Sequence, residues 1–400
     1  MRINYLHQYF NTPSMPGGTR SYEMARRLVA MGHEVNMVTS WREPDGRKDW
    51  FTTDEAGIQV HWLPVPYSNH MSYNQRIASF FKFAWGAARK AASLPADVVF
   101  ATSTPLTIAL PGVYAARRQK VPMVFEVRDL WPEVPIAMGA LQNPLIRSAA
   151  FKLERLAYAN SSEIVALSPA MAVSIHKNGV SAERITEIPN SCDLNIFYPD
   201  ELLRRQFRSA HGINDDKILF VYTGTFGRVN EVSYLAYLAD ALVDDQRFHF
   251  LSIGDGVDYD HVHQLSDELG VLNKNMTMLK RIPKAEMTSV LAAADIASSF
   301  VAPIPELEGN SANKFFDGLA AGKPIVTNYG GWQKDLLEKY KAGLPLTRDV
   351  KKASSTLDDF IANPNLIKEY GQNAMVLAEK KFDRDKLAKQ LEDVLSSATR

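Results

Sequence analysis

The chain repeats one pattern along its 400 residues, in which short apolar runs alternate with longer segments of helical period. Such alternation is typical of a parallel β-sheet covered by helices, because strands buried on both faces are apolar throughout. Glycines and prolines separate the runs. The pattern therefore predicts an α/β fold. The predicted strands are Arg2–Leu6, Glu34–Thr39, Ile58–Leu63, Asp97–Ala101, Pro122–Val127, Glu163–Ala166, Ile185–Ile188, Ile218–Tyr222, Phe248–Ile253, Met276–Leu279, Ile296–Phe300 and Pro324–Thr327.

The alternation stops and restarts near residues 190–200, at a connection bounded by prolines. A chain of this length suits two cores better than one. We therefore expect two doubly wound, Rossmann-like domains at residues 1–190 and 200–382, and a terminal helix over 383–400 that packs back on the first. Ligands of such sheets bind at the carboxyl ends of the strands. The predicted site is a cleft between two facing domains.

The composition argues against several classes of function. Lys plus Arg and Asp plus Glu both number 45, so the net charge gives no reason to expect a nucleic-acid partner. Cys192 is the only cysteine, which excludes an internal disulfide and a cysteine-based metal cluster. A reducing, cytoplasmic compartment is the simplest expectation. We expect neither a signal peptide in Met1–Leu6 nor a membrane span in residues 103–116, because both runs are too short.

Glycine-containing turns follow the first strand of each predicted domain. Gly17-Gly18-Thr19-Arg20 precedes a helix, where backbone amides can approach a phosphate. Thr223-Gly224-Thr225-Phe226-Gly227-Arg228 can admit a diphosphate, which the arginine would bind with two parallel hydrogen bonds. The alternatives are a tight structural turn and a surface arginine. A complete G-x-G-x-x-G is absent, which argues against a nicotinamide dehydrogenase.

Two further segments place charged side chains where burial would be costly. Asp317 lies in the apolar helix that begins near Asn313, and its carboxylate could accept both hydroxyls of a ribose. Glu126, Arg128 and Asp129 crowd the end of a first-domain strand and would be hard to bury in a structural core. The alternatives are a solvent-facing aspartate and an ion-paired edge.

Taken in order, these motifs resemble family 4 of the glycosyltransferases, which has the GT-B architecture of two facing Rossmann-like domains. The resemblance covers nearly the whole chain and is closest to bacterial O-antigen and capsule transferases, including those that move N-acetylfucosamine-type sugars. The motifs that carry it are Gly17-Gly18-Thr19-Arg20, Gly32-His33-Glu34-Val35, Arg128-Asp129-Leu130-Trp131-Pro132-Glu133, Ile188-Pro189-Asn190, Ile253-Gly254-Asp255-Gly256, Ala294-Asp295 and Ala320-Ala321-Gly322-Lys323-Pro324.

The resemblance implies a retaining transfer from a UDP-linked sugar, with no cofactor and no bound metal. Arg228 would bind the donor diphosphate, and Asp317 would hold the ribose as the second carboxylate of an E-x7-E motif. The implied donor-binding residues are Gly17, Gly18, Gly227, Arg228, Arg281, Asn313, Lys314 and Asp317. The implied catalytic residues are Glu126, Arg128 and Asp129, near the reacting sugar. We interpret Asp258-Tyr259-Asp260 as a solvated loop and not as a metal site.

The sequence departs from the family pattern in three places. Gly309 stands where the first carboxylate of E-x7-E belongs, and Arg128 stands where relatives often carry a histidine. No basic residue follows Arg228 within Asn230–Ser233, so Lys280, Arg281 or Lys314 would have to compensate. Because the missing carboxylate commonly receives ring hydroxyls of glucose or mannose, a deoxy or acetamido sugar is the expected donor.

The segment from Arg76 to Ala92 combines aromatic and basic residues at helical spacing. These are Phe80, Phe81, Phe83 and Trp85 with Arg76, Lys82, Arg89 and Lys90. Such a helix suits the headgroup region of an anionic bilayer, although a core-facing helix with a solvated basic side is the alternative. We expect a peripheral protein on the cytoplasmic face of the inner membrane, acting on a polyprenyl diphosphate-linked saccharide. A GT-B enzyme with a soluble acceptor, and a catalytically silent nucleotide-sugar-binding scaffold, remain open.

Overall fold

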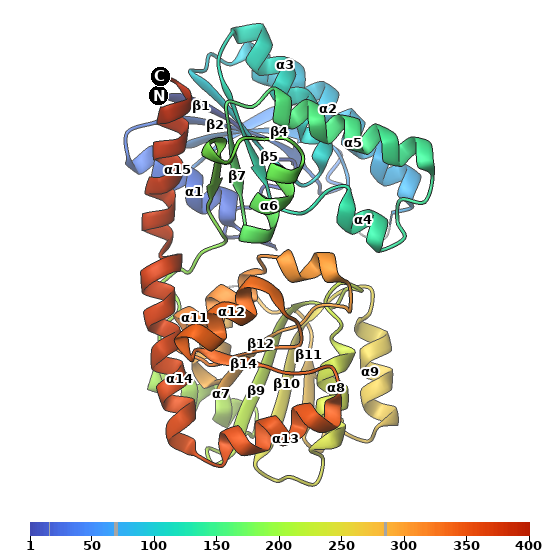
Figure 1. Ribbon diagram of the computed structural model, residues 1–400, viewed down its shortest axis with the longest axis vertical. Helices are drawn as coiled ribbons and strands as arrows, with labels where there is room; N and C mark the ends of the chain where they lie inside the picture. The colour runs from blue at the N-terminus through green and yellow to red at the C-terminus, as the bar shows by residue number, and fades with distance from the viewer. Residues whose placement is uncertain (16, 68–70, 284–285) are drawn as a thin grey trace. The chain divides into compact units, whose positions relative to one another are not determined.

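The computed structural model describes residues 1–15, 17–67, 71–283 and 286–400. The chain divides into two compact units. Unit 1 comprises Met1–Pro189 and Asp385–Arg400, and unit 2 comprises Asn190–Arg384. Each unit contains one β-sheet with helices on both of its faces (Figure 1).

The strands of unit 1 are β1 (Arg2–Leu6), β2 (Glu34–Trp41), β3 (Phe51–Glu55), β4 (Ile58–Pro64), β5 (Val98–Thr102), β6 (Met123–Val127), β7 (Glu163–Ala166) and β8 (Ile185–Glu187). Those of unit 2 are β9 (Ile218–Thr225), β10 (Phe248–Asp255), β11 (Met276–Leu279), β12 (Ile296–Ser299), β13 (Ile325–Thr327) and β14 (Gly343–Pro345). The helices are α1 (Arg20–Ala30), α2 (Tyr73–Ser93), α3 (Ala109–Gln119), α4 (Glu133–Ala137), α5 (Pro144–Ala159), α6 (Pro169–Lys177), α7 (Glu201–Ala210), α8 (Ser233–Ala241), α9 (Tyr259–Glu268), α10 (Met287–Ala293), α11 (Asn313–Ala320), α12 (Gly331–Tyr340), α13 (Val350–Ile361), α14 (Pro364–Leu377) and α15 (Arg384–Ala398). In the described part of the chain, no helix is both long and apolar enough to span a bilayer.

Both sheets are doubly wound, as the alternation predicts. The strand order is β3-β4-β2-β1-β5-β6-β7-β8 in unit 1 and β11-β10-β9-β12-β13-β14 in unit 2. Every pair is parallel except β3 with β4. In each sheet the order reverses at one place, between β1 and β5 and between β9 and β12. The carboxyl ends of strands at such a switch point open a crevice in which ligands bind.

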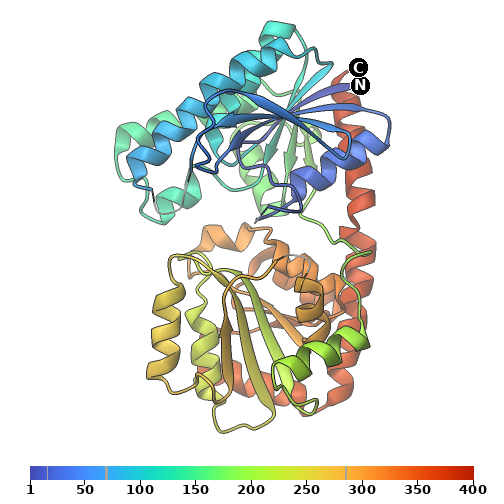
Figure 2. The same ribbon diagram turned by 180° about the vertical axis from the view of Figure 1, so that it is seen from behind.

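Alternate residues of the unit 1 strands bury on opposite faces. In β1, Leu6 packs against α2, α3 and α5, whereas Ile3 and Tyr5 pack against α1 and α15. Figure 2 shows α1 and α15 side by side on this second face. The C-terminal helix is therefore a structural part of unit 1, which it joins after the chain has completed unit 2.

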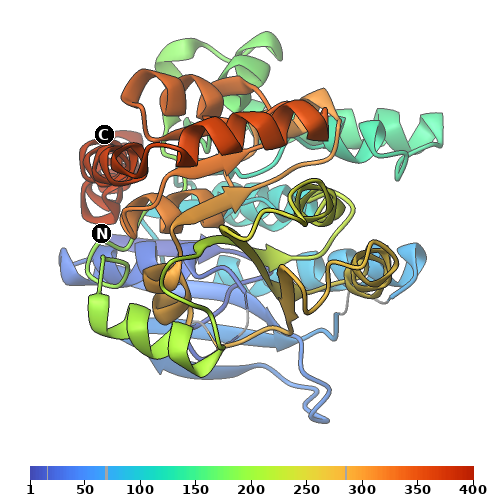
Figure 3. The same ribbon diagram turned by 90° about the horizontal axis from the view of Figure 1, so that it is seen from below.

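The same alternation builds unit 2. Phe220 and Tyr222 of β9 pack against α8, α9 and α13, and Leu219 and Val221 pack against α7 and α10. Figure 3 shows α7 and α13 on opposite sides of the sheet. Further apolar side chains of α11, α12 and α14 form an adjoining core beside β13.

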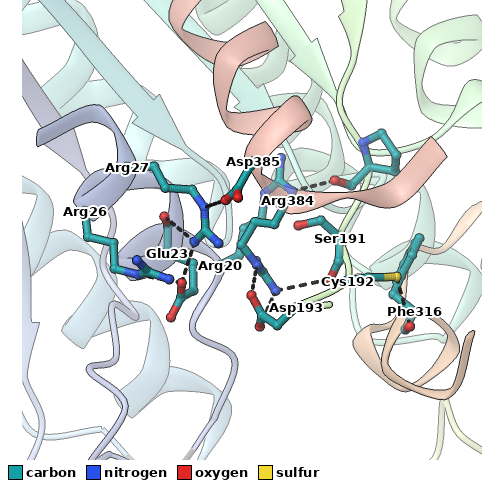
Figure 4. Close-up of polar contacts among 11 residues, drawn as sticks. Arg20, Glu23, Arg26, Arg27, Ser191, Cys192, Asp193, Phe316, Arg384 and Asp385 are labelled. Carbon is teal, nitrogen blue, oxygen red and sulfur yellow. Dashed lines mark hydrogen bonds and ion pairs between the residues drawn. The ribbon is translucent and has the colours of Figure 1, made fainter. Parts of the chain in front are cut away.

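Residues 190–199, predicted as a connection, belong to unit 2. The Cys192 side chain is buried, its backbone N–H donates to the Phe382 carbonyl, and its thiol donates to the Phe316 carbonyl at 3.0 Å. Arg384 donates to Asp193 at 2.9 Å (Figure 4). The segment that enters unit 2 is thus fixed to the segment that leaves it. The next residue, Asp385, belongs to unit 1. Figure 4 shows its carboxylate bound to Arg27 of α1.

A pair of carboxyl groups lies within the helical layer that follows β6. Glu154 of α5 is 1% exposed and accepts a hydrogen bond from the Tyr158 hydroxyl at 3.0 Å. Glu133 of α4 accepts one from Ser174 of α6 at 3.3 Å. Burial, helped by the Glu133 charge and opposed by the Tyr158 hydrogen bond and the Arg155 charge, raises the pKa of Glu154 to about 7.

This pKa predicts a stability that falls with pH. The protonated Glu154 carboxyl contributes fully below its ordinary pKa of 4.5, and the contribution is lost as the pH rises through about 7. The gap is equivalent to roughly 3 kcal/mol. Glu154→Gln should abolish the loss, so that the variant gains stability over the wild type between about pH 5 and 8. Urea unfolding followed by tryptophan fluorescence measures it, because five of the six tryptophans lie in unit 1.

The exposed Glu183, in the same unit, provides the control. Glu183→Gln should unfold with the pH dependence of the wild type. An equal pH dependence in Glu154→Gln and the wild type would contradict a protonated Glu154.

Candidate functional site

The switch point of unit 1 brings His7 and Arg128 together. The Arg128 guanidinium lies 3.1 Å from the His7 Nε2, and its backbone N–H donates to the Ser103 Oγ at 3.0 Å. Because a guanidinium only donates, the His7 Nε2 is the acceptor and the ring proton lies on Nδ1. Burial and the Arg128 charge hold the pKa of His7 well below its ordinary value. The imidazole is therefore neutral near pH 7.

Asp129 lies beside this pair and is exposed. Its carboxylate accepts a hydrogen bond of 2.6 Å from the Thr104 hydroxyl, which follows β5. The structure thus gathers Arg128, Asp129, His7 and Thr104 at the carboxyl ends of β1, β5 and β6. A cation and an exposed carboxylate can bind a polar ligand there.

Glu126 lies deeper and is fully buried, contrary to the expectation that it would be hard to bury. One of its carboxylate oxygens accepts from Arg20 at 2.8 and 3.1 Å, and the other accepts from the Thr102 hydroxyl. Burial opposes ionisation, but the Arg20 and Arg128 charges hold the pKa of Glu126 below its ordinary value. Both oxygens are engaged by the protein, so this geometry favours a positioning role for Glu126.

Arg20 connects that carboxylate with two other segments. It follows the Gly17-Gly18 turn, and its remaining N–H groups donate to the carbonyls of Ile188 at 2.8 Å and Pro189 at 2.6 Å. Gly17 has φ +125°, and a Cβ there would lie 2.6 Å from the Asn11 amide nitrogen. Gly17 and Gly18 are both exposed at the start of α1.

The switch point of unit 2 carries the second group of predicted residues. The loop after β9 contains the half-buried Gly227 and the exposed Arg228. Within the described residues, Arg228 makes no hydrogen bond or ion pair. Gly224, near the end of β9, is exposed and has φ +135°, a conformation that an L side chain rarely adopts.

Lys314, on the first turn of α11, reaches this loop from behind. Its ammonium nitrogen lies 2.7 Å from the Tyr222 hydroxyl oxygen and 3.1 Å from the Asn230 Oδ1. Both partners are uncharged, and burial lowers the pKa of Lys314 to about 7. The side chain is partly exposed at the edge of this loop. With a pKa of about 7, it can change its charge near neutral pH.

The remaining predicted donor residues are less closely gathered. Asn313 is exposed at the first position of α11, and the half-buried Asp317 lies one turn further on. Asp317 is close enough to Cys192 to help burial raise the pKa of that thiol. Arg281 is exposed beyond β11 and, among the described residues, makes no hydrogen bond or ion pair.

Of the three bases that could compensate for the missing one, Lys314 is the one that contacts the loop after β9. Lys280 lies 3.7 Å from Asp255 and covers the Tyr259 ring. In place of a base, the loop carries Glu231, whose carboxylate binds Arg348 and Asn328. Glu231 is therefore paired with Arg348 and not with Lys314.

The structure also defines the surroundings of Asp258-Tyr259-Asp260 and of Gly309. The segment Asp258-Tyr259-Asp260 is not a solvated loop, because it starts α9 and buries Tyr259. The Glu308 carboxylate, next to Gly309, accepts from the backbone N–H of Gly330 at 3.4 Å. In the described ranges, no three His, Cys, Asp or Glu side chains are grouped so as to hold a metal ion.

Sequence reasoning missed His7, Thr104 and the partner of Arg20. His7 and Thr104 follow directly on β1 and β5, so their place after a strand at a switch point could have indicated them. The pairing of Arg20 with Glu126 joins residues 106 positions apart, and no local pattern indicates it.

The buried pair gives a testable prediction. Arg20→Met should lower the free energy of unfolding of unit 1 by about 3–5 kcal/mol, because it leaves the Glu126 charge buried and unpaired. Arg26→Met on the same helix should cost less than about 1 kcal/mol, because that arginine is 39% exposed. Urea unfolding of both variants measures the difference. Equal costs would show that the pair does not hold unit 1 together.

Comparisons with known proteins identify the family of the chain. A family model described as "Glycosyl transferase 4-like domain" matches residues 17–191, and one described as "Glycosyl transferases group 1" matches residues 204–377. No curated protein sequence matches the chain.

Solved structures similar to the chain include Alr3699/HepE from Anabaena in complex with UDP, with 18% identity, TM-score 0.73, and coverage of 99% of this chain and 100% of that one. Sucrose-phosphate synthase from Thermosynechococcus elongatus has 14% identity and TM-score 0.79, with coverage of 99% and 98%. WaaG, a glycosyltransferase involved in lipopolysaccharide biosynthesis, has 17% identity and TM-score 0.72, with coverage of 98% and 99%.

The two family matches follow one another along most of the chain, and the solved structures share its two parallel-sheet units. The chain therefore belongs to the glycosyltransferases of the GT-B fold, with a family 4-like domain followed by a group 1 domain.

Proposed function

We propose that this glycosyltransferase moves a sugar from a UDP-sugar to a lipid-linked saccharide, with retention at the anomeric carbon. The observation that carries the proposal is a pair of basic side chains beside the loop after β9, Arg228 in the loop and Lys314 on α11. Arg228 is exposed, Lys314 hydrogen-bonds to two neutral oxygens, and no carboxylate in the described part of the chain pairs with either. Two basic side chains without a counter-charge, beside an exposed glycine, suit a diphosphate.

In this proposal the donor residues act on the leaving diphosphate. Negative charge grows on it as the glycosidic bond breaks, and Arg228 and Lys314 stabilise that charge from fixed positions. Asp317, three residues after Lys314 on α11, accepts hydrogen bonds from the ribose hydroxyls. Gly227 and Asn313 line the same site, and Gly17 and Gly18 offer backbone amides to the donor phosphate. Arg281, which is exposed beyond β11, contacts the donor only at the edge of the site.

The acceptor side of the proposal uses the switch point of unit 1. Arg128 and Asp129 are available to a ligand, whereas Glu126 acts through Arg20 and the loop that carries them. Since Gly309 replaces the family carboxylate that receives ring hydroxyls, we propose a deoxy or acetamido sugar of the N-acetylfucosamine type. Surface polysaccharide, as in O-antigen or capsule, is the proposed destination.

The proposed reaction needs no bound metal. Neutralisation of the diphosphate, which a divalent cation supplies in other transferases, falls here to the two protein cations. The described residues also offer no cluster of metal ligands beside the loop after β9. Metal independence remains a proposal that the transfer assay tests directly.

The transfer assay uses a panel of UDP-sugars with a polyprenyl diphosphate-linked saccharide. A longer lipid-linked glycan should form, should keep the anomeric configuration of the donor by NMR, and should still form in EDTA. Arg228→Ala should lower kcat by about 100–1,000-fold, because it removes one preorganised donor to the developing charge. Arg228→Lys should lower kcat less, since it keeps the charge but loses the planar two-pronged contact.

Arg205 is the matched control, because its side chain is 71% exposed and its one ion pair among the described residues is with Glu201 on its own helix. Arg205→Ala should transfer sugar at the wild-type rate. Product in the aqueous phase would indicate a soluble acceptor, and tight UDP binding without turnover would indicate a scaffold. Activity that EDTA removes and magnesium restores would refute the metal-free reaction.

We further propose that the layer of α2, α3 and α5 contacts an anionic membrane surface. On α2, Phe83 is buried, but Phe81 and Trp85 are 53% and 66% exposed beside Lys82 and Arg89. The Arg89 guanidinium lies 4.6 Å from the Trp85 ring centroid. Exposed aromatics beside bases suit lipid headgroups.

The neighbouring helices extend this surface. A groove of about 420 Å³ between α3 and α5 is lined by Leu110, Val113, Tyr114, Arg117, Arg118 and Leu156. Leu145, near the start of α5, is 80% exposed. Apolar side chains bordered by arginines again suit the interface of a bilayer, where a lipid-linked acceptor would be presented.

Vesicle sedimentation tests this surface. The wild type should bind vesicles that contain anionic lipid and should bind neutral phosphatidylcholine vesicles weakly. Phe81→Ser with Trp85→Ser should lower the bound fraction, whereas Tyr237→Ser, which alters a 43% exposed aromatic of unit 2, should not. Equal binding by all three proteins would exclude α2 as the contact.

A further inference from the structure

We propose that Lys314 rests as a neutral amine and takes up a proton when a phosphate of the nucleotide docks at the loop after β9. This inference rests on the proposed donor site and deepens it. It makes nucleotide binding and proton uptake one event.

The hydrogen bonds around Tyr222 fix the donor roles of the amine. The Tyr222 hydroxyl donates its single proton to the Thr225 carbonyl at 2.8 Å. Lys314 must therefore donate to the Tyr222 oxygen at 2.7 Å, and it also donates to the Asn230 Oδ1 at 3.1 Å. These two bonds use both N–H groups of a neutral amine. An ammonium has a third N–H, for which the described residues provide no acceptor.

Among the described residues no carboxylate pairs with the amine, and the Tyr222 ring, whose centroid lies 4.2 Å from the nitrogen, favours the ammonium only weakly. Burial is the cause that lowers the pKa of Lys314 to about 7, and no nearby carboxylate reverses it. The charged groups on the elements around it are Arg228 and Glu231 in the loop, Arg348 after β14, Asp255 at the end of β10, Lys280 after β11, and Asp317 on α11. Glu231, the acid in the same loop, binds Arg348 instead.

Gly224 leaves the amine accessible from the loop. A Cβ at this position would lie 3.3 Å from the Lys314 Cε and 3.5 Å from its nitrogen. Because glycine has no side chain, nothing at position 224 covers the amine on the exposed side of this residue. A phosphate oxygen that approaches the backbone of Gly224 would find the third hydrogen-bonding position of Lys314.

A phosphate there reverses the balance between the two forms. A negative charge within hydrogen-bond distance favours the ammonium and raises the pKa of the lysine. A proton from solvent then joins the amine lone pair, and the third N–H donates to the phosphate. With a pKa near 7 in the free protein, about half a proton per bound nucleotide should be taken up at about pH 7.

This role explains how the loop functions without the usual base after Arg228. Lys314 supplies the second cation from another element, and it does so only when the ligand is present. Asn230, which occupies part of the segment where the base is missing, holds the amine in position through its Oδ1.

Calorimetry of UDP binding in buffers of different ionisation enthalpy tests the inference. The dependence of the observed heat on the buffer gives the number of protons taken up. Lys314→Gln keeps a polar side chain that cannot charge, and Lys314→Arg keeps a permanent charge. Because UDP itself titrates, the quantity of interest is the uptake by the wild type minus that by each variant. It should be about half a proton at about pH 7 and should vanish near pH 5, where the lysine is already charged.

Lys314→Gln should also weaken UDP binding by about 10–100-fold, the loss expected for a hydrogen bond to a charged group. UDP binding with equal proton uptake in the wild type and both variants would overturn the inference and leave the donor site intact. Failure of the wild type to bind UDP would overturn the donor site together with the inference. If Lys314→Gln fails to fold, Lys314→Arg alone decides, since a permanent charge also removes the uptake.

Discussion

One buried ion pair fixes three parts of unit 1 that lie far apart in the sequence. Arg20 follows the Gly17-Gly18 turn, and Glu126 precedes Arg128 and Asp129 by only two or three residues. The arginine also holds the carbonyls at the point where the chain leaves the unit. A buried pair adds little net stability over an apolar substitute, but breaking it is costly. Its contribution here is to hold a turn, a strand end and an exit segment in one arrangement.

The sequence predicts the sheets well because parallel strands buried on both faces are continuous apolar runs. The two strands it misses lack that property. Phe51–Glu55 is an antiparallel edge strand whose residues are half-buried or exposed, and Gly343–Pro345 is only three residues long. The site is predictable where it is local, as in the loop with Arg228. It is not predictable where distant residues meet. The sequence does not show that Lys314, and not Arg281, contacts this loop, because that contact depends on the hydroxyl of Tyr222.

The two switch points handle charge in different ways. In unit 1 the buried carboxylate of Glu126 is neutralised within the fold, and the neutral His7 accepts from Arg128, so the exposed Asp129 is left for a ligand. In unit 2 the loop acid Glu231 pairs with Arg348, so Arg228 and Lys314 have no counter-charge among the described residues. Each unit thus pairs its buried charges internally and leaves other charged side chains available at the carboxyl ends of its strands.

The division of the chain has a consequence for its synthesis. Unit 2 is one continuous segment, whereas unit 1 needs the final helix, whose leucines 387, 391 and 395 bury against the sheet that begins with β1. A ribosome makes that helix only after it has made unit 2. Domains generally fold as they emerge from the ribosome. Unit 1 cannot complete its core in this way, because the sheet face that α15 covers stays exposed while about two hundred further residues are made. Unit 2 can complete its core first, although unit 1 precedes it in the sequence, and the order of folding is then the reverse of the order of translation.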